Sequence, residues 1–158
     1  MKLFKCLALL AALPMAGIAV DAVEAGNYYV RQYYSGWHSH NEGHYYYRHY
    51  YYKPAPTYTG YRHHYVIYYP SRPKYYYYYN PYKKVYWGRC PVDYNGEEQY
   101  SMLAEKDRKG DIAQIPETAF PKPTATPLIP ESTDGEKLDL PPDDPPASDE
   151  QGLPKTAA

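Results

Sequence analysis

Residues 45–52 read YYYRHYYY, and residues 75–79 read YYYYY. Tyrosine favours β-strands, but a run of one aromatic residue lacks the alternation of apolar and polar side chains that fixes the buried face of a strand. Prolines at positions 54, 56, 70, 73 and 81 also interrupt the region every few residues. We therefore expect residues 26–81 to be a basic, Tyr- and His-rich low-complexity region. It would be fluctuating extended chain, with transient strands at residues 65–69 and 74–79.

Aliphatic residues are scarce in the remainder of the chain. From residue 26 onward, 15 of 133 positions are Val, Ile, Leu, Met or Phe, and a fraction below about 20% is typical of disordered chains. Tyrosine can build a core only if each buried hydroxyl finds a hydrogen-bond partner. The predicted fold class is therefore mostly disordered and low in complexity.

Residues 82–115 have a different character. An apolar, β-favouring run from Val85 to Val92 is followed by Asn95-Gly96 and then by Tyr100, Met102 and Leu103. An Asn-Gly pair between two such runs predicts a hairpin, with strands at residues 83–90 and 99–103. One or two helical turns would follow between residues 101 and 109. We expect at most this one small β-hairpin unit with a short helical turn, and a lone hairpin is marginally stable in water.

The last part of the chain is acidic and rich in proline. Ten of the 43 residues from 116 to 158 are proline, which predicts a disordered tail with partly polyproline II conformation. Residues 27–91 hold nine Lys and Arg against one acidic residue, whereas residues 92–158 hold 15 acidic residues against six Lys and Arg. We expect these oppositely charged blocks to attract each other.

The N-terminus predicts export. Lys2 and Lys5 precede an apolar stretch from residue 6 to residue 20, and small residues then precede Gly26. This pattern is typical of a secretory signal peptide covering residues 1–25, cleaved after Ala25 or alternatively after Ala22. The apolar stretch is shorter than the roughly 18–20 residues of a membrane-spanning helix. A secreted, periplasmic or cell-surface protein without a transmembrane segment in the mature chain is expected.

Two groups of side chains are candidates for chemistry. His38, His40 and His44 lie within seven residues of one another, and imidazole clusters suit Cu²⁺ or Zn²⁺. The alternative is that histidine is a further spacer among the tyrosines, and disordered ligands bind metal weakly. Cys90 is the one cysteine outside the signal peptide. An odd cysteine in an exported protein indicates an intermolecular disulfide or a free thiol.

The sequence contains no pattern typical of an enzyme. It has no glycine-rich phosphate loop, no paired-cysteine metal motif and no serine elbow. Catalytic groups also need a rigid scaffold that holds them within hydrogen-bond reach. We therefore predict that the protein is not an enzyme and binds no obligatory cofactor.

Three segments carry a resemblance to a known group of proteins. They are residues 87–103, which begin Trp87-Gly88-Arg89-Cys90, residues 115–121 and residues 129–135. Across residues 75–146 the chain resembles small exported tyrosine-rich bacterial proteins for which no activity is known. The resemblance implies a bacterial exported protein and implies nothing about mechanism.

These observations predict a structural or adhesive interaction protein of the cell envelope or extracellular matrix. Stacking between rings and contacts between Arg and rings are each weak, but many together give multivalent binding. The partner would be a second copy of the chain or an envelope or matrix polymer, and export argues against nucleic acid. The alternatives are a weak transition-metal-binding protein and a polyanion- or glycan-binding module.

Overall fold

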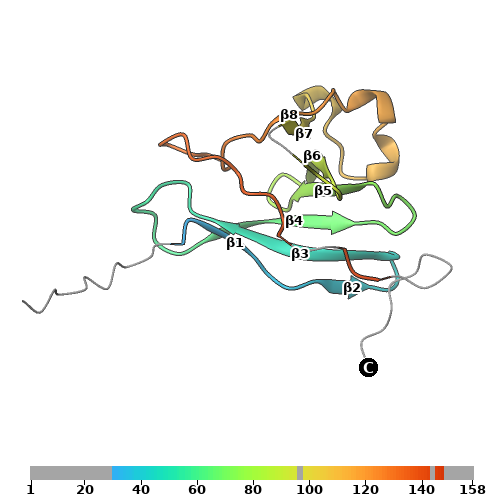
Figure 1. The fold of residues 1–158 in the computed structure, drawn as a ribbon, viewed down its shortest axis with the longest axis horizontal. Coiled ribbons are helices and arrows are strands. Elements are labelled where there is room, and N and C mark those ends of the chain that lie inside the picture. The colour runs from blue at the N-terminus through green and yellow to red at the C-terminus, as the bar shows by residue number, and fades with distance from the viewer. Residues whose placement is uncertain (1–29, 96–97, 143–144, 148–158) are drawn as a thin grey trace, which may run out of the picture.

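The computed structural model describes residues 30–95, 98–142 and 145–147. Within them, eight strands form a curled antiparallel sheet in the order β1-β3-β4-β5-β6-β7-β8, and β2 also pairs with β3 (Figure 1). The strands are β1 (Gln32–Tyr34), β2 (His38–His40), β3 (Tyr45–Tyr52), β4 (Arg62–Tyr68), β5 (Tyr75–Asn80), β6 (Val85–Pro91), β7 (Glu98–Met102) and β8 (Thr124–Ala125). The predicted disordered, low-complexity chain is therefore wrong for this part of the protein.

The tyrosine runs form strands because both faces of the sheet accept aromatic rings. Along β3, even-numbered residues are buried and odd-numbered residues are half-buried. Successive side chains of a strand point to opposite faces, so YYYRHYYY places tyrosines on each face. An alternation of apolar and polar residues is unnecessary where both faces are aromatic. This is the physical reason why the prediction for residues 26–81 failed.

β1 and β2 together form one interrupted edge strand beside β3. Gln32 pairs with Tyr52 in β1, and His40 pairs with Tyr45 in β2. Between the two pieces, the backbone N–H of Ser35 donates to the carbonyl of His49 at 2.9 Å. The Nε of Arg48 donates to the carbonyl of Ser35 at 2.7 Å. A turn at residues 41–44 then leads directly into β3.

The inner face of the sheet is covered by the C-terminal segment. Ile129 and Leu138 pack into a core of buried rings that includes Tyr50, Tyr78 and Trp87, and this segment crosses the sheet in Figure 1. Three tyrosine hydroxyls of this face have acceptors there and nearby. The Tyr34 hydroxyl donates to the Asp139 carbonyl at 2.5 Å, and the Tyr46 hydroxyl donates to the Ala147 carbonyl at 2.8 Å. The Tyr50 hydroxyl donates to Gln32 Oε1 at 2.7 Å. The described part of the predicted disordered tail is thus a cover for the core.

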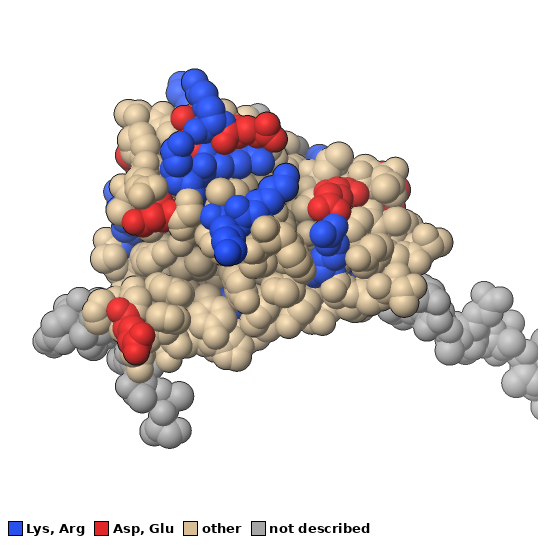
Figure 2. All heavy atoms as spheres, turned by 180° about the vertical axis from the view of Figure 1, so that it is seen from behind, with Lys and Arg blue, Asp and Glu red and all other residues tan. Residues whose placement is uncertain are grey.

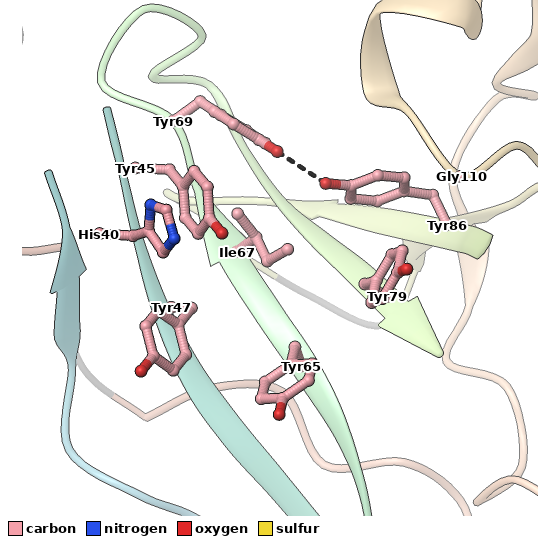
Figure 3. Close-up of a pocket in the computed structure, with 9 residues that line it drawn as sticks. All are labelled: His40, Tyr45, Tyr47, Tyr65, Ile67, Tyr69, Tyr79, Tyr86 and Gly110. Atoms are coloured by element: carbon pink, nitrogen blue, oxygen red, sulfur yellow. Dashed lines mark hydrogen bonds between the residues drawn. The ribbon is translucent and has the colours of Figure 1, made fainter. Parts of the chain in front are cut away.

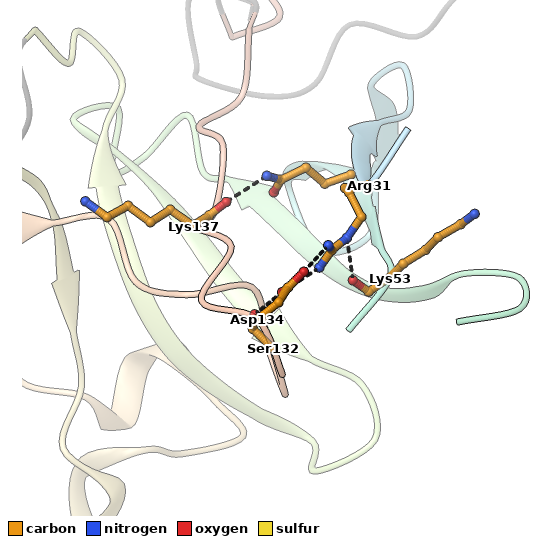
Figure 4. Close-up of polar contacts among 6 residues, drawn as sticks. Arg31, Lys53, Ser132, Asp134 and Lys137 are labelled. Atoms are coloured by element: carbon orange, nitrogen blue, oxygen red, sulfur yellow. Dashed lines mark hydrogen bonds and ion pairs between the residues drawn. The ribbon is translucent and has the colours of Figure 1, made fainter. Parts of the chain in front are cut away.

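A polar clamp holds this segment against β1 (Figure 4). The Arg31 guanidinium donates to both carboxylate oxygens of Asp134, at 2.5 and 3.1 Å, and its Nε donates to the carbonyl of Lys53 at 3.3 Å. Gln32 Nε2 donates to the carbonyl of Lys137 at 2.7 Å. The clamp therefore fixes residues 134–137 at the edge of the inner face.

The outer face is covered over part of its area. Three 3₁₀ helices follow β7, namely η1 (Glu105–Asp107), η2 (Ile112–Gln114) and η3 (Glu117–Ala119). Leu103, Ile112, Ile115 and Phe120 from this region form a second core with Ile67, Tyr77 and Tyr86. This cover lies over β5 and β6, while the odd-numbered side chains of β3 stay half-buried.

The predicted hairpin coincides with β6 and β7, but it is no isolated unit. Gly88 pairs with Met102 and Arg89 pairs with Ser101, while β6 also pairs with β5 along its length. The register shifts between Tyr78 and Tyr79, and a Cβ on Gly88 would overlap the ring of Tyr100. The predicted helical turn is the short 3₁₀ helix η1. The hairpin is thus part of the large sheet.

The oppositely charged blocks meet within the molecule. Arg31 pairs with Asp134, Arg62 pairs with Glu131, and Arg89 pairs with Glu117 at 2.6 Å. Each pair joins the basic block to the acidic one. Figure 2 shows one side of the molecule, where Lys and Arg gather in the upper half with acidic residues among them.

Two further expectations concern the N-terminus and the membrane. The predicted signal peptide of residues 1–25, with its cleavage sites, lies outside the described residues. Among the described residues, no helix has the length and apolar character needed to cross a membrane.

Candidate functional site

The open part of the outer face is a continuous array of aromatic rings. Four neighbouring strands contribute half-buried or exposed His and Tyr side chains to this array. We call this set of residues the outer aromatic face. They are His38 and His40 of β2, Tyr45, Tyr47, His49 and Tyr51 of β3, His63 and Tyr65 of β4, and Tyr79 of β5. The strand register places Tyr65 between His49 and Tyr79.

The rings of this face hold one another in place. Tyr45 stacks on His40 with centroids 4.6 Å apart, and Tyr51 stacks on His49 at 5.4 Å. Tyr65 lies 4.9 Å from His49. Such pairs contribute about 0.5–1.5 kcal/mol each beyond the area they bury. The array is therefore an ordered surface, in contrast to the fluctuating chain predicted from the sequence.

A pocket of about 400 Å³ opens in this face at the border of the covered region. Ile67 lies between the rings of Tyr45 and Tyr79, with Tyr47 and Tyr65 farther along the sheet (Figure 3). At the opposite side, the hydroxyls of Tyr69 and Tyr86 are hydrogen-bonded at 2.6 Å. The pocket thus has an apolar floor and walls made of phenol rings.

Among the described residues, no Asp, Glu, Lys or Arg lines the pocket of the outer aromatic face. Burial lowers the pKa of His49, and the neighbouring His63 and His38 lower it further. Burial also lowers the pKa of His63 and raises the pKa of Tyr45 and Tyr65. The imidazoles of His49 and His63 and these phenols are consequently uncharged at neutral pH. Both groups can donate and accept hydrogen bonds in that state.

The predicted metal candidates lie at one end of this face. His38 stacks on Tyr47 at 5.4 Å, and the Nδ1 of His40 accepts a hydrogen bond from the Gly43 backbone N–H at 2.9 Å. His44 ends the turn with a φ of 51°. Within the part of the chain that the structure describes, no three His, Cys, Asp or Glu side chains are grouped so that they could hold a metal ion. Binding of Cu²⁺ or Zn²⁺ at His38, His40 and His44 stays a prediction.

Cys90 lies in the inner core and is fully buried. Burial raises the pKa of its thiol to about 12, so the reactive thiolate is scarce at neutral pH. A disulfide to another molecule would require the inner core to open first. The intermolecular disulfide therefore stays a prediction.

Reasoning from the sequence named His38 and His40 as metal candidates but missed the other members of the outer aromatic face. The signal was present in YYYRHYYY, where residues 45, 47, 49 and 51 share a face at the two-residue period of a strand. The pairing of His49 with Tyr65 has no comparable signal, because it depends on the register between β3 and β4.

Comparison with known proteins found no similar family model, no similar curated protein and no similar solved structure.

Proposed function

We propose that this protein is an exported interaction protein of the cell envelope or extracellular matrix that binds a neutral glycan on its outer aromatic face. This proposal rests on the ordered array of half-buried and exposed rings, together with a pocket that no described Asp, Glu, Lys or Arg lines. Multivalent tyrosine contacts were predicted from the sequence. The ordered array of rings on the outer face supports this proposal.

The chemistry of the face matches that of a sugar. A pyranose has apolar C–H faces that pack on aromatic rings, and its hydroxyls both donate and accept hydrogen bonds. The face offers ring surface together with phenol and imidazole groups that have the same dual character. Tyrosine also provides a large contact area with little loss of side-chain entropy on binding.

The dimensions of the face suit several sugar units. Alternate residues of a strand lie about 6.8 Å apart, so Tyr45 to Tyr51 extends over roughly 20 Å. The pocket beside Tyr45 and Tyr79, at about 400 Å³, lies within the size range of small-molecule sites. We therefore expect the face to bind an extended chain, with one unit inserted in the pocket.

The charge of the face favours a neutral polymer over an anionic one. Binding of nucleic acid or another polyanion depends on Lys and Arg contacts with the charged groups, and among the described residues no Lys or Arg lines the pocket of the outer aromatic face. A neutral glycan, in contrast, needs no charge neutralisation.

Retention on polysaccharide beads tests the proposal. The purified protein is passed over chitin, cellulose and xylan, which are neutral, and over heparin, which is anionic, at physiological ionic strength. We expect retention on at least one neutral polysaccharide and weaker retention on heparin. A Tyr47→Ala/Tyr65→Ala double variant should bind about tenfold less tightly, because removal of an aromatic anchor commonly costs more than about 1 kcal/mol.

The matched control is Tyr58→Ala. Tyr58 is 40% exposed but lies in the loop between β3 and β4, outside the array, so its removal should leave retention unchanged. Circular dichroism of each variant confirms that the sheet is intact. Failure to bind any neutral polysaccharide, preferential binding to heparin, or equal loss in Tyr58→Ala contradicts the proposal.

A further inference from the structure

A second pocket, of about 520 Å³, lies away from the outer aromatic face. It is bounded by the turn between β5 and β6, by Met102 at the end of β7 and by residues 127–132 of the C-terminal segment. Three parts of the chain that are distant in sequence therefore form its walls. The pocket shares no lining residue with the outer aromatic face.

Two cationic side chains, Lys83 and Arg108, line the pocket. The Nε of Arg108 donates to the Leu103 carbonyl at 3.2 Å, which fixes the guanidinium at the pocket wall. Within the described residues, neither cation is part of an ion pair. The one carboxylate in the lining, Glu131, is already paired with Arg62. The pocket consequently has positive charge available for an anion.

Two buried ring nitrogens beside these cations have no hydrogen-bond partner within the described structure. They are Nε1 of Trp87, in a residue 7% exposed, and Nδ1 of His64, in a residue 3% exposed. The hydroxyl of Tyr52 lies 3.3 Å from His64 Nε2. Burial lowers the pKa of His64, so its ring is neutral at neutral pH. In the tautomer that accepts from the Tyr52 hydroxyl at Nε2, the ring proton is on Nδ1. Nδ1 of His64 and Nε1 of Trp87 are then both donors that lack an acceptor within the described residues.

The remaining walls are apolar and accessible. Leu128 and Met102 are 49% and 40% exposed, and both line the pocket. Exposed aliphatic surface next to cations and unpaired N–H donors is complementary to a molecule with an apolar body and an anionic head. We infer that this second pocket binds a small carboxylate with an apolar body. The carboxylate contacts Lys83 and Arg108 and accepts from the edges of the Trp87 and His64 rings.

Cyclohexylacetate and its uncharged amide, cyclohexylacetamide, are the matched probes. Titration of the full chain by calorimetry should give about tenfold tighter binding of the acid, because a charge-assisted hydrogen bond is stronger than a neutral one. The chain has two tryptophans, Trp37 and Trp87, and a Trp37→Phe variant assigns their indole N–H signals in a proton–nitrogen NMR spectrum. On addition of the acid, the Trp87 signal should move downfield, and the Trp37 signal should not.

Charge removal separates this site from non-specific attraction. Lys83→Gln and Arg108→Gln should each weaken the acid about tenfold and leave the amide unaffected. Lys84→Gln is the control, since Lys84 is an exposed neighbour in the same turn that does not line the pocket. Equal affinity for acid and amide, a stationary Trp87 signal, or an equal effect of Lys84→Gln overturns the inference. The glycan-binding variants leave this pocket intact, so the two proposals fail independently.

Discussion

On the inner face of the sheet, Tyr46, Tyr50 and Tyr52 are at most 4% exposed, whereas Tyr47 and Tyr51 of the same strand are half-buried on the outer face. The two sets share a residue type, a strand and a backbone conformation. What differs is the segment packed on each face. The inner rings meet the C-terminal segment and its carbonyl groups, whereas no described segment covers the outer rings of β3 in this way.

This difference shows how a tyrosine core becomes stable with few aliphatic residues. A buried hydroxyl without a partner costs free energy, and on the inner face backbone carbonyls of residues 139 and 147 accept from Tyr34 and Tyr46. The same ring therefore serves as core or as binding surface according to whether an acceptor-bearing segment covers it.

Removal of the inner cover should have the largest effect. A chain ending at Thr126 lacks Ile129 and Leu138, which pack into the inner core, and we expect it to lose most of a stability of about 5–15 kcal/mol. Near-ultraviolet circular dichroism should show no fixed tertiary packing. The control is the full chain with Arg31→Gln, which removes one side of the half-buried clamp and should keep the fold, since a single ion pair near the surface contributes little compared with the core contacts of the segment. Cooperative unfolding of the truncated chain near the original Tm would refute the role of the segment.

Removal of one ring from each face compares how much inner and outer tyrosines contribute to the unfolding free energy. Tyr78→Ala on the inner face should cost about 3–5 kcal/mol, the range for a large aromatic residue replaced in a core. Tyr47→Ala on the outer face should cost about 1 kcal/mol or less. Urea unfolding of both variants gives the two free energies. Equal losses would show that the outer rings are as much a part of the core as the inner ones.

Histidines on the two faces should differ in their response to acid. Burial lowers the pKa of inner-face His64 to about 3, below the unfolded value of about 6.5. Between these pH values the unfolded chain binds a proton that the folded chain does not, so stability falls with decreasing pH by up to about 1.4 kcal/mol per unit. Above about pH 6.5, His64 is neutral in both the folded and the unfolded chain, so its burial no longer makes the unfolding free energy depend on pH.

Replacement of His64 with Gln should therefore flatten the dependence of the unfolding free energy on pH between about 6.5 and 4. His63→Gln on the outer face should flatten this pH dependence less. His63 is only half-buried, so burial lowers its pKa less than it lowers the pKa of the deeply buried His64. Urea unfolding across this pH range provides the comparison. A slope that His64→Gln leaves unchanged would mean that His64 is protonated in the folded protein.

Local signals predicted one part of the fold. Asn95-Gly96 between two β-favouring runs indicated the strands that became β6 and β7. The rest depends on partners distant in sequence. Pro141, taken as a sign of a disordered tail, is fully buried, and its carbonyl accepts from the Tyr94 hydroxyl at 2.8 Å. Proline forbids helix and central strand, but it leaves a carbonyl that a tyrosine can use.

The candidate site was predictable in its chemistry and not in its geometry. The stacking of aromatic rings follows from the abundance of tyrosine, and the two-residue period assigns residues 45, 47, 49 and 51 to one face. Which face stays open depends on where residues 103–120 pack, and identical residues on both faces give no indication of that choice.

The inner cover also determines when folding can be completed. Residues 127–142 come after every strand in chain order, and the Tyr34 hydroxyl meets a carbonyl 105 positions later. Contacts of such long separation are formed slowly because the intervening chain must first be brought together. A partly synthesised chain therefore exposes its inner tyrosines until its far end emerges. Apolar surface that is exposed during that interval favours aggregation.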